Sequence, residues 1–161
     1  MEHQYRLKTV SCELEVTFRA PLRFVFLWCT DYQPSDSKLE KEDYVRKMIE
    51  RTSRRVIFED LQEMRDGWSW QRATIFLYPP NRWHMDNTGN RRDVKADYVL
   101  TSLPGARTRL HLRWRVWPKT TAASKLSKTD RERTVATAWK KFGAALEDDY
   151  NRLRLQRNKR S

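Results

Sequence analysis

The sequence is poor in the residues that several large classes of functional site require. Only four of its 161 residues are glycine, too few for the glycine-rich loop that cradles phosphates in nucleotide-binding proteins. Its three histidines and two cysteines are scattered without metal-ligand spacing, and a Gly-x-Ser-x-Gly nucleophile motif is absent. We therefore expect no metal and no cofactor, and any catalysis would be acid-base chemistry in a pocket.

Long apolar runs are missing as well. The longest, Phe24–Cys29, has six residues, whereas a membrane-spanning helix needs about 20, and Met1–Lys8 lacks the apolar core of a secretion signal. Cys12 and Cys29 lie in apolar segments outside any Cys-x-x-Cys arrangement, which favours buried thiols over a disulfide. We expect one domain over residues 1–161, without an integral membrane segment and located in the reducing cytoplasm.

Positive charge is abundant and unevenly distributed. The formal net charge is +12, and residues 101–161 hold 16 of the 33 Lys and Arg but only 5 of the 21 Asp and Glu. We expect a basic face that includes Arg109, Arg113, Arg115, Arg152 and Arg154. Such a face attracts polyanions or anionic membranes weakly through counterion release and steering. The alternative is a solvated, solubilising surface that ends in a frayed basic tail at 155–161.

The first third of the chain predicts one strand and two helices. Apolar and polar residues alternate over Val10–Phe18, which is typical of a strand with one buried face. Helical spacing follows Pro21 over Leu22–Cys29. A polar loop then leads to a second expected helix at about Lys41–Thr52, whose apolar stripe would be Tyr44, Val45, Met48 and Ile49.

Period-two segments dominate the middle of the chain and predict five more strands. Short turn sequences such as Asp66-Gly67 and Pro104-Gly105 separate them. Because such short connections suit antiparallel neighbours, we expect a meander of Arg54–Met64, Trp68–Tyr78, Trp83–Thr88, Arg91–Ser102 and Arg107–Trp117. In the last strand Leu110, Leu112, Trp114 and Val116 share one face, which should be buried, while Arg109, His111, Arg113 and Arg115 share the other.

A long amphipathic helix is predicted to close the chain. Thr129 and Glu132 have the spacing of a capping box at its start, and about 25 residues to Gln156 would span about 37 Å. One helical face collects the apolar positions Val135, Ala138, Trp139, Phe142, Ala145, Leu146 and Leu153. A helix of that length needs a broad partner surface, so we expect it to lie across the sheet.

The predicted fold class is α+β, a curved antiparallel sheet of about six strands wrapped around the terminal helix. This order resembles the helix-grip fold of the START-like superfamily (SRPBCC), which includes Bet v 1-like allergens, lipid-transfer START domains and polyketide cyclase/dehydrase-like proteins. The local likeness lies in Phe18–Pro21 followed by Val25-Phe26, in Asp31, and in Asn87–Gly89 with Arg91. The resemblance implies a cavity between sheet and helix that holds a hydrophobic or amphipathic small molecule.

Large aromatic side chains fit such a cavity. If the strand phases hold, six of them face the space between the sheet and the helix: Trp70, Phe76, Tyr98, Trp114, Trp139 and Phe142. Aromatic rings suit a site with apolar walls and few polar contacts. The alternative is that they simply fill the core.

Polar residues supply two further candidates. Arg72 shares parity with Trp70 and Phe76, so it would bind a ligand carboxylate or phosphate at the pocket mouth. With the opposite phase, Ala73 and Ile75 would face inward and Arg72 would lie in water. His84 and Asp86, with Tyr98 on the next strand, are candidate catalytic acid-base residues; otherwise they are surface residues of a hairpin.

Three functions are compatible with these features. The first is binding, transport or sensing of a lipid-, quinone- or polyketide-like molecule without chemistry. The second is a cyclase or dehydratase in which His84, Asp86 and Tyr98 exchange protons and Arg72 orients an anionic end. The third is a binding module whose basic face contacts nucleic acid or anionic membrane.

Overall fold

The computed structural model describes residues 7–160 of the chain. Its elements run strand, two short helices, six strands, a short helix and a long helix. They are β1 (Val10–Phe18), α1 (Leu22–Cys29), α2 (Asp36–Glu40), β2 (Tyr44–Arg51), β3 (Arg55–Met64), β4 (Gly67–Tyr78), β5 (Arg82–Gly89), β6 (Arg92–Leu103), β7 (Arg107–Pro118), α3 (Thr121–Ser124) and α4 (Lys128–Asn158). The predicted α+β class and the five-strand meander are confirmed, with strand ends within a few residues of expectation.

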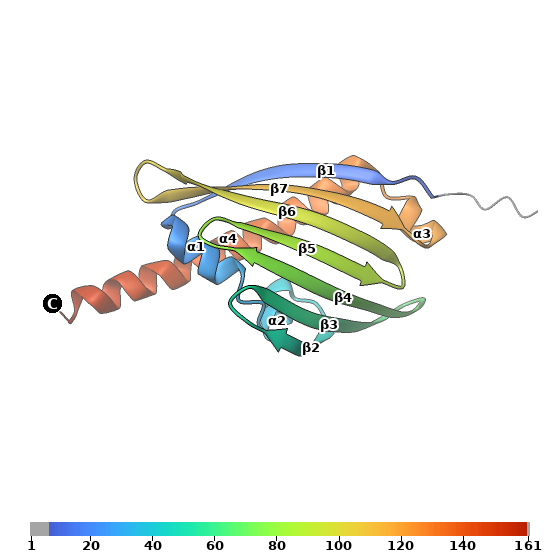
Figure 1. Ribbon diagram of the computed structural model, residues 1–161, viewed down its shortest axis with the longest axis horizontal. Coiled ribbons are helices and arrows are strands. Elements are labelled where there is room, and N and C mark those ends of the chain that lie inside the picture. Colours follow the sequence, from blue (N-terminus) through green and yellow to red (C-terminus); the bar gives the residue numbers. More distant parts are fainter. Residues whose placement is uncertain (1–6, 161) are drawn as a thin grey trace, which may run out of the picture.

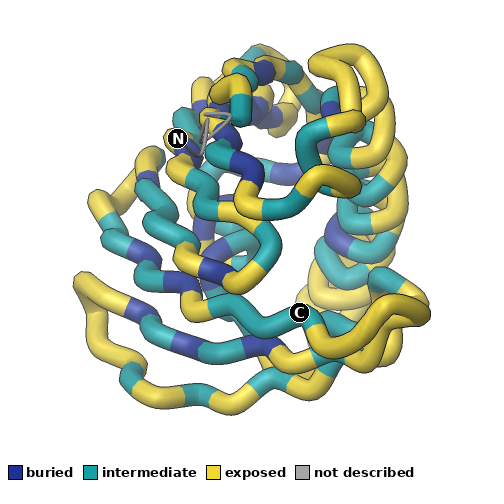
Figure 2. The backbone as a smooth tube through the Cα atoms, turned by 90° about the vertical axis from the view of Figure 1, so that its right-hand side faces the viewer, coloured by how far each residue is buried: buried dark blue, intermediate teal, exposed yellow. Residues whose placement is uncertain are grey.

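All seven strands form one antiparallel sheet in the order β1-β7-β6-β5-β4-β3-β2. The sheet curves, and α4 runs across its inner side (Figures 1 and 2). Gly67 and Gly105 adopt positive φ angles of 123° and 78° in two of the hairpin turns, a conformation that costs little only for glycine. The sheet therefore presents one face to the helix and one to solvent.

The alternation predicted for the last strand is confirmed. In β7 Leu110, Leu112, Trp114 and Val116 are buried beneath the helix side of the sheet, whereas Arg109, Arg113 and Arg115 are exposed on the other side. Ser11 to Thr17 of β1 pair with Arg115 to Arg109 of β7, and the buried Cys12 and Phe18 extend the apolar layer. Burying a side chain of this size stabilises the fold by roughly 1.5–3 kcal/mol.

The helix predicted over about Lys41–Thr52 is wrong, since Tyr44–Arg51 forms the edge strand β2 against β3. This strand is the seventh of the sheet, where about six were expected. The inward positions are Tyr44, Arg46 and Met48, and the Arg46 side chain is only 7% exposed because it pairs with Asp60 of β3. A buried cation at an inward position interrupts the apolar alternation by which a strand is recognised.

Helix α4 begins two residues earlier than expected. Ser127 caps it, and the Ser127 side chain and Asp130 bond reciprocally to each other's backbone N–H, so the capping box is not Thr129 with Glu132. Both pairs have the same three-residue spacing, which is why the sequence pattern alone did not separate them. With 31 residues the helix spans about 46 Å.

The middle of α4 anchors it to β1 and α1, and its last turns extend beyond the sheet (Figure 1). Leu146 is fully buried. A Cβ atom at Gly143 would lie 3.3 Å from the Phe18 ring, so the helix approaches β1 closely there. Leu153, expected on the buried face, is 47% exposed because it lies on the protruding turns. The helix continues through Asn158 where a frayed tail at 155–161 was expected, and Ser161 lies outside the described residues.

Candidate binding cavity

A cavity of about 310 Å³ lies between the inner face of the sheet and the first half of α4. Met85, Val94 and Ala96 of β5 and β6 form part of its floor, and Val135 of α4 faces them. The helix packs against β1, at one edge of the sheet. Because these side chains are small or medium in size, they do not fill the resulting space.

Aromatic rings form the apolar wall of the cavity. Three of the six predicted aromatics, Tyr98, Trp114 and Trp139, line it. The ring centroids of Tyr98 and Trp139 are 6.4 Å apart, and Tyr98 stacks on the buried Trp83 with centroids 4.7 Å apart. Desolvation raises the pKa of the Tyr98 phenol well above its usual value, so this ring is neutral at physiological pH.

Phe142 contributes to packing beside the cavity and does not line it. Its ring contacts Trp139 at a centroid distance of 5.4 Å and Trp28 of α1 at 6.5 Å. Tyr32, which follows α1, does line the cavity and packs on Phe58 at 5.4 Å. The sequence reading missed Tyr32 because it lies in a polar loop without periodicity.

The phase of β4 places Trp70, Arg72 and Phe76 on the outer face of the sheet. Ala73 and Ile75 are fully buried, so the alternative in which Arg72 lies in water holds. Its guanidinium is half-exposed and pairs with Glu59 at 2.8 Å. Both faces of β4 carry large apolar residues, and hydrophobicity alone therefore does not decide which face is buried. Arg72 therefore does not lie at the mouth of the cavity, contrary to the expectation from the sequence.

The candidate acid-base residues His84, Asp86 and Tyr98 lie on two different faces of the sheet. Trp83 is buried, so His84 and Asp86 point outward, whereas Tyr98 points into the cavity. The two His84 ring nitrogens lie 2.8 Å from Asp97 and 2.8 Å from Asp86. Desolvation lowers the pKa of His84, but the hydrogen bonds to Asp97 and Asp86 outweigh it, and the pKa is raised overall. These three residues do not form one catalytic site.

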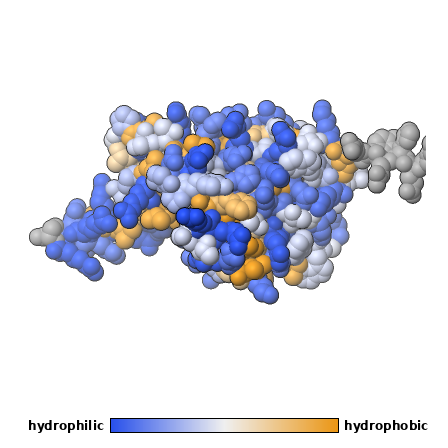
Figure 3. Space-filling view, viewed as in Figure 1, coloured by the Kyte–Doolittle hydropathy of each residue, from blue (hydrophilic) through white to orange (hydrophobic). Residues whose placement is uncertain are grey.

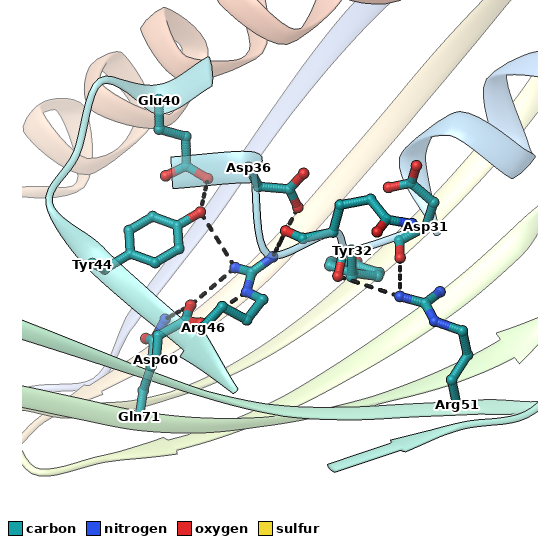
Figure 4. Close-up of polar contacts among 10 residues, drawn as sticks. Asp31, Tyr32, Asp36, Glu40, Tyr44, Arg46, Arg51, Asp60 and Gln71 are labelled. Atoms are coloured by element: carbon teal, nitrogen blue, oxygen red, sulfur yellow. Dashed lines mark hydrogen bonds and ion pairs between the residues drawn. The ribbon is translucent and has the colours of Figure 1, made fainter. Parts of the chain in front are cut away.

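A network of charged residues joins α2, β2 and β3 beside the cavity (Figure 4). Arg46 lines the cavity, pairs with Asp60 and with Asp36 at 2.8 Å each, and lies 3.9 Å from the centre of the Phe58 ring. Glu40 of α2 accepts a hydrogen bond from the Tyr44 hydroxyl at 2.9 Å. Short helix α2 also contacts α4, so the network ties the edge of the sheet to the helix.

In this network, desolvation and the charges of neighbouring groups shift the pKa values in opposite directions. Desolvation lowers the pKa of Arg46, but its hydrogen bond and charge interaction with Asp60 raise it further, so the guanidinium stays charged. For Asp36 desolvation is the largest effect and raises the pKa to about 6, although the Arg46 charge acts in the opposite direction. The sequence offered one signal for this cluster, the charged segment around Ser35–Lys47, but not the pairing with Asp60.

Two further arginines, Arg92 of β6 and Arg131 of α4, line the cavity near the start of α4. Neither was among the predicted site residues. Arg92 is the first residue of its strand, and Arg131 lies in the first turn of a helix, positions at which a cation usually faces water. Only the assembled fold brings them to one end of the cavity.

The predicted basic residues do not share one surface. Arg109, Arg113 and Arg115 project from the outer face of β7, whereas Arg152 and Arg154 are exposed on the protruding turns of α4, which crosses the other side of the sheet. The outer face is largely hydrophilic, and apolar side chains gather over β2 and β3, where Val45, Ile49 and Leu61 are exposed (Figure 3).

Two negative findings bear on the site. Over residues 7–160, no group of three or more His, Cys, Asp or Glu side chains is placed to hold a metal ion. Within that same range, none of the helices combines the length and the apolar character needed to cross a membrane.

Comparison with known proteins identifies the fold. No family model matches the sequence, and no curated protein does. Among solved structures, TTHA0849 from Thermus thermophilus is 13% identical with a TM-score of 0.70, over 85% of this chain and 97% of that one. A START superfamily protein from Mycobacterium smegmatis is 12% identical with a TM-score of 0.62, over 89% and 98%. Zhui aromatase/cyclase from Streptomyces sp. R1128 is 13% identical with a TM-score of 0.58, over 88% and 90%. The chain therefore has the predicted START-like helix-grip fold.

Proposed function

We propose that this protein binds a hydrophobic or amphipathic small molecule in the cavity between the sheet and α4. The observation that carries the proposal is the hollow itself, about 310 Å³ in volume and walled by Tyr98, Trp114 and Trp139. Small-molecule sites usually measure roughly 300–1,000 Å³ and combine apolar walls with a few polar groups. The START superfamily neighbour supports the same reading of the fold.

Binding, for transport or sensing, is favoured over catalysis. The aromatase/cyclase neighbour suggests cyclisation chemistry, which requires a general acid or base within reach of the ligand. His84 and Asp86 lie on the opposite side of the sheet from the cavity, and desolvation raises the pKa of the Tyr98 phenol, which makes it a weaker proton donor. The charged Arg46 and its carboxylate partners are engaged with one another.

A matched pair of substitutions on neighbouring residues of β6 tests the proposal. Val94 is half-buried and lines the cavity, whereas Lys95 is exposed on the outer face. Val94→Trp should fill the hollow, and Lys95→Trp should add the same ring outside it. The neutral probe N-phenyl-1-naphthylamine, whose fluorescence rises in apolar surroundings, reports occupancy.

We expect the probe to bind the wild type and Lys95→Trp with similar affinity, and Val94→Trp at least about tenfold more weakly, which corresponds to about 1.4 kcal/mol. Circular dichroism and urea unfolding establish that both variants are folded. A folded Val94→Trp protein that binds the probe as the wild type does would place the binding elsewhere. Failure of the wild type to bind would contradict the proposal.

A further inference from the structure

Two arginines at one end of the cavity have no acidic partner within the described part of the chain. Arg131 is 5% exposed; its Nη2 atom donates a hydrogen bond to the Ala123 carbonyl oxygen, and its buried Nε atom has no hydrogen-bond partner among those residues. Across residues 7–160, no ion pair links Arg92 or Arg131 to a carboxylate. A buried guanidinium without a counter-charge is costly.

Arg92 is exposed toward the hollow and yet desolvated by the walls around it. Its pKa is lowered, first by desolvation and second by the like charge of Arg131. Both side chains line the same cavity. Two cations that repel each other across a cavity create a favourable position for an anion between them.

The carboxylates around these two arginines are engaged with other groups, including Glu42, which shares a pocket with Arg92 and accepts a hydrogen bond from the Gln62 amide. Asp60 pairs with Arg46, and Glu40 accepts the Tyr44 hydroxyl. Glu132, beside Arg131 in sequence, accepts the Glu13 backbone N–H at 2.9 Å. Asp93, beside Arg92, pairs with Lys119 at 2.8 Å. Arg46 therefore has two carboxylate partners, whereas the ion pairs of the described residues include neither Arg92 nor Arg131.

We infer that the ligand is an amphipathic carboxylic acid whose carboxylate lies between Arg92 and Arg131. Guanidinium groups bind carboxylates through paired, charge-assisted hydrogen bonds, and the side chains of both Arg92 and Arg131 line the cavity. The apolar body of the ligand then contacts Tyr98, Trp114 and Trp139 along the aromatic wall. This inference rests on the proposed function and specifies the class of ligand.

Matched acid and alcohol probes separate the head group from the apolar body. The probes are 2-naphthoate with 2-naphthylmethanol, and decanoate with 1-decanol, titrated calorimetrically near neutral pH. The wild type should bind each acid at least about tenfold more tightly than its alcohol, a difference of about 1.4 kcal/mol. Apolar contacts are nearly the same within a pair, so the ratio reports the head group.

Arg92→Gln decides the test, because Arg92 faces the hollow and its replacement leaves the packed core unchanged. This variant should reduce the acid-to-alcohol ratio by about tenfold while leaving affinity for the alcohol within about twofold. Arg131→Gln should act in the same direction, and Arg131→Lys should retain part of the preference because it keeps the charge. Arg113→Gln, which removes the same charge from the outer face, is the control and should leave the ratio unchanged.

The outcomes distinguish the two proposals. Equal affinity for acid and alcohol in the wild type would overturn the carboxylate inference while leaving the binding cavity supported. A preference for the acid that persists in Arg92→Gln at the level of the Arg113→Gln control would also overturn it. If neither acid nor alcohol binds the wild type, the proposed function fails and the inference fails with it.

Discussion

Removing Arg46 should destabilise the fold strongly, because its side chain lines the cavity and neutralises two carboxylates there, Asp36 and Asp60. The Arg46 and Asp60 side chains are 7% and 6% exposed, and their atoms approach to 2.8 Å. Arg46→Met keeps most of the side-chain length but leaves Asp60 and Asp36 without their cation. Breaking a buried ion pair by removing one partner costs about 3–5 kcal/mol. That is a large share of the total stability of roughly 5–15 kcal/mol that is typical of a domain.

Urea unfolding near neutral pH measures the effect, and two further variants interpret it. The double variant Arg46→Met/Asp60→Asn also removes the unpaired negative charge of Asp60, and it should recover at least about half of the free energy of unfolding lost in Arg46→Met. Arg55→Met breaks a comparable pair, with Glu50 at 2.6 Å, that is exposed on the surface; this control should cost much less stability than Arg46→Met, because solvent screens an exposed pair. A loss below about 1 kcal/mol in Arg46→Met, or a double variant as unstable as the single one, would refute the reasoning.

Three more predictions follow from the same packing and charges. The pKa of Asp36 is raised from 3.8 to about 6, so the folded state binds the Asp36 proton more tightly than the unfolded state does. The free energy of unfolding of the wild type should therefore fall by up to about 3 kcal/mol as pH rises through this range. Asp36→Asn should abolish this pH dependence in urea unfolding. The raised pKa of His84 should appear in an NMR titration as a midpoint above 6.5, and its stabilising contribution, complete below 6.5, should disappear as pH rises through that midpoint. Asp97→Asn should lower the midpoint, and a His84 midpoint at or below 6.5 in the wild type would contradict the assignment. Leu146→Ala, at a fully buried position, should cost about 2–5 kcal/mol in urea unfolding, and a loss below about 1 kcal/mol would show that the middle of α4 is not anchored.

Much of the fold could be predicted from the periodic spacing of apolar residues. In β7, strict alternation separates the buried Leu110 to Val116 set from the exposed arginines, and the structure confirms it. The long apolar stripe of α4 likewise located the terminal helix. Such patterns are reliable because burying one apolar face is the dominant stabilising effect. Apolar residues therefore recur every two positions in a strand and about every 3.6 positions in a helix.

The failures lie where charge or aromatic content obscures that pattern. The inward Arg46 made β2 look unlike a strand, since its burial depends on Asp60, fourteen residues away. In β4, Trp68, Trp70 and Phe76 lie on the outer face, and the smaller Ala73 occupies the core position. Half of the predicted aromatic wall was consequently placed on the wrong side or beside the cavity.

Arg92 and Arg131 could not be predicted as cavity residues from the sequence for a different reason. Arg92 and Arg131 are 39 positions apart and belong to ordinary-looking charged segments. Their proximity depends on the angle at which α4 crosses the sheet, which no local pattern encodes. What the sequence did contain was the regional excess of positive charge from which one of these residues comes.

The central claim is that a small molecule occupies the hollow between the sheet and α4, and the indole N–H signals of the seven tryptophans test it most directly. Trp114 and Trp139 line the cavity, whereas Trp68 and Trp70 lie on the outer face. In an NMR titration with 2-naphthoate, the account predicts saturable shifts of the two cavity signals and unchanged signals from the two outer residues. Unchanged cavity signals, or shifts confined to Trp68 and Trp70, would contradict it.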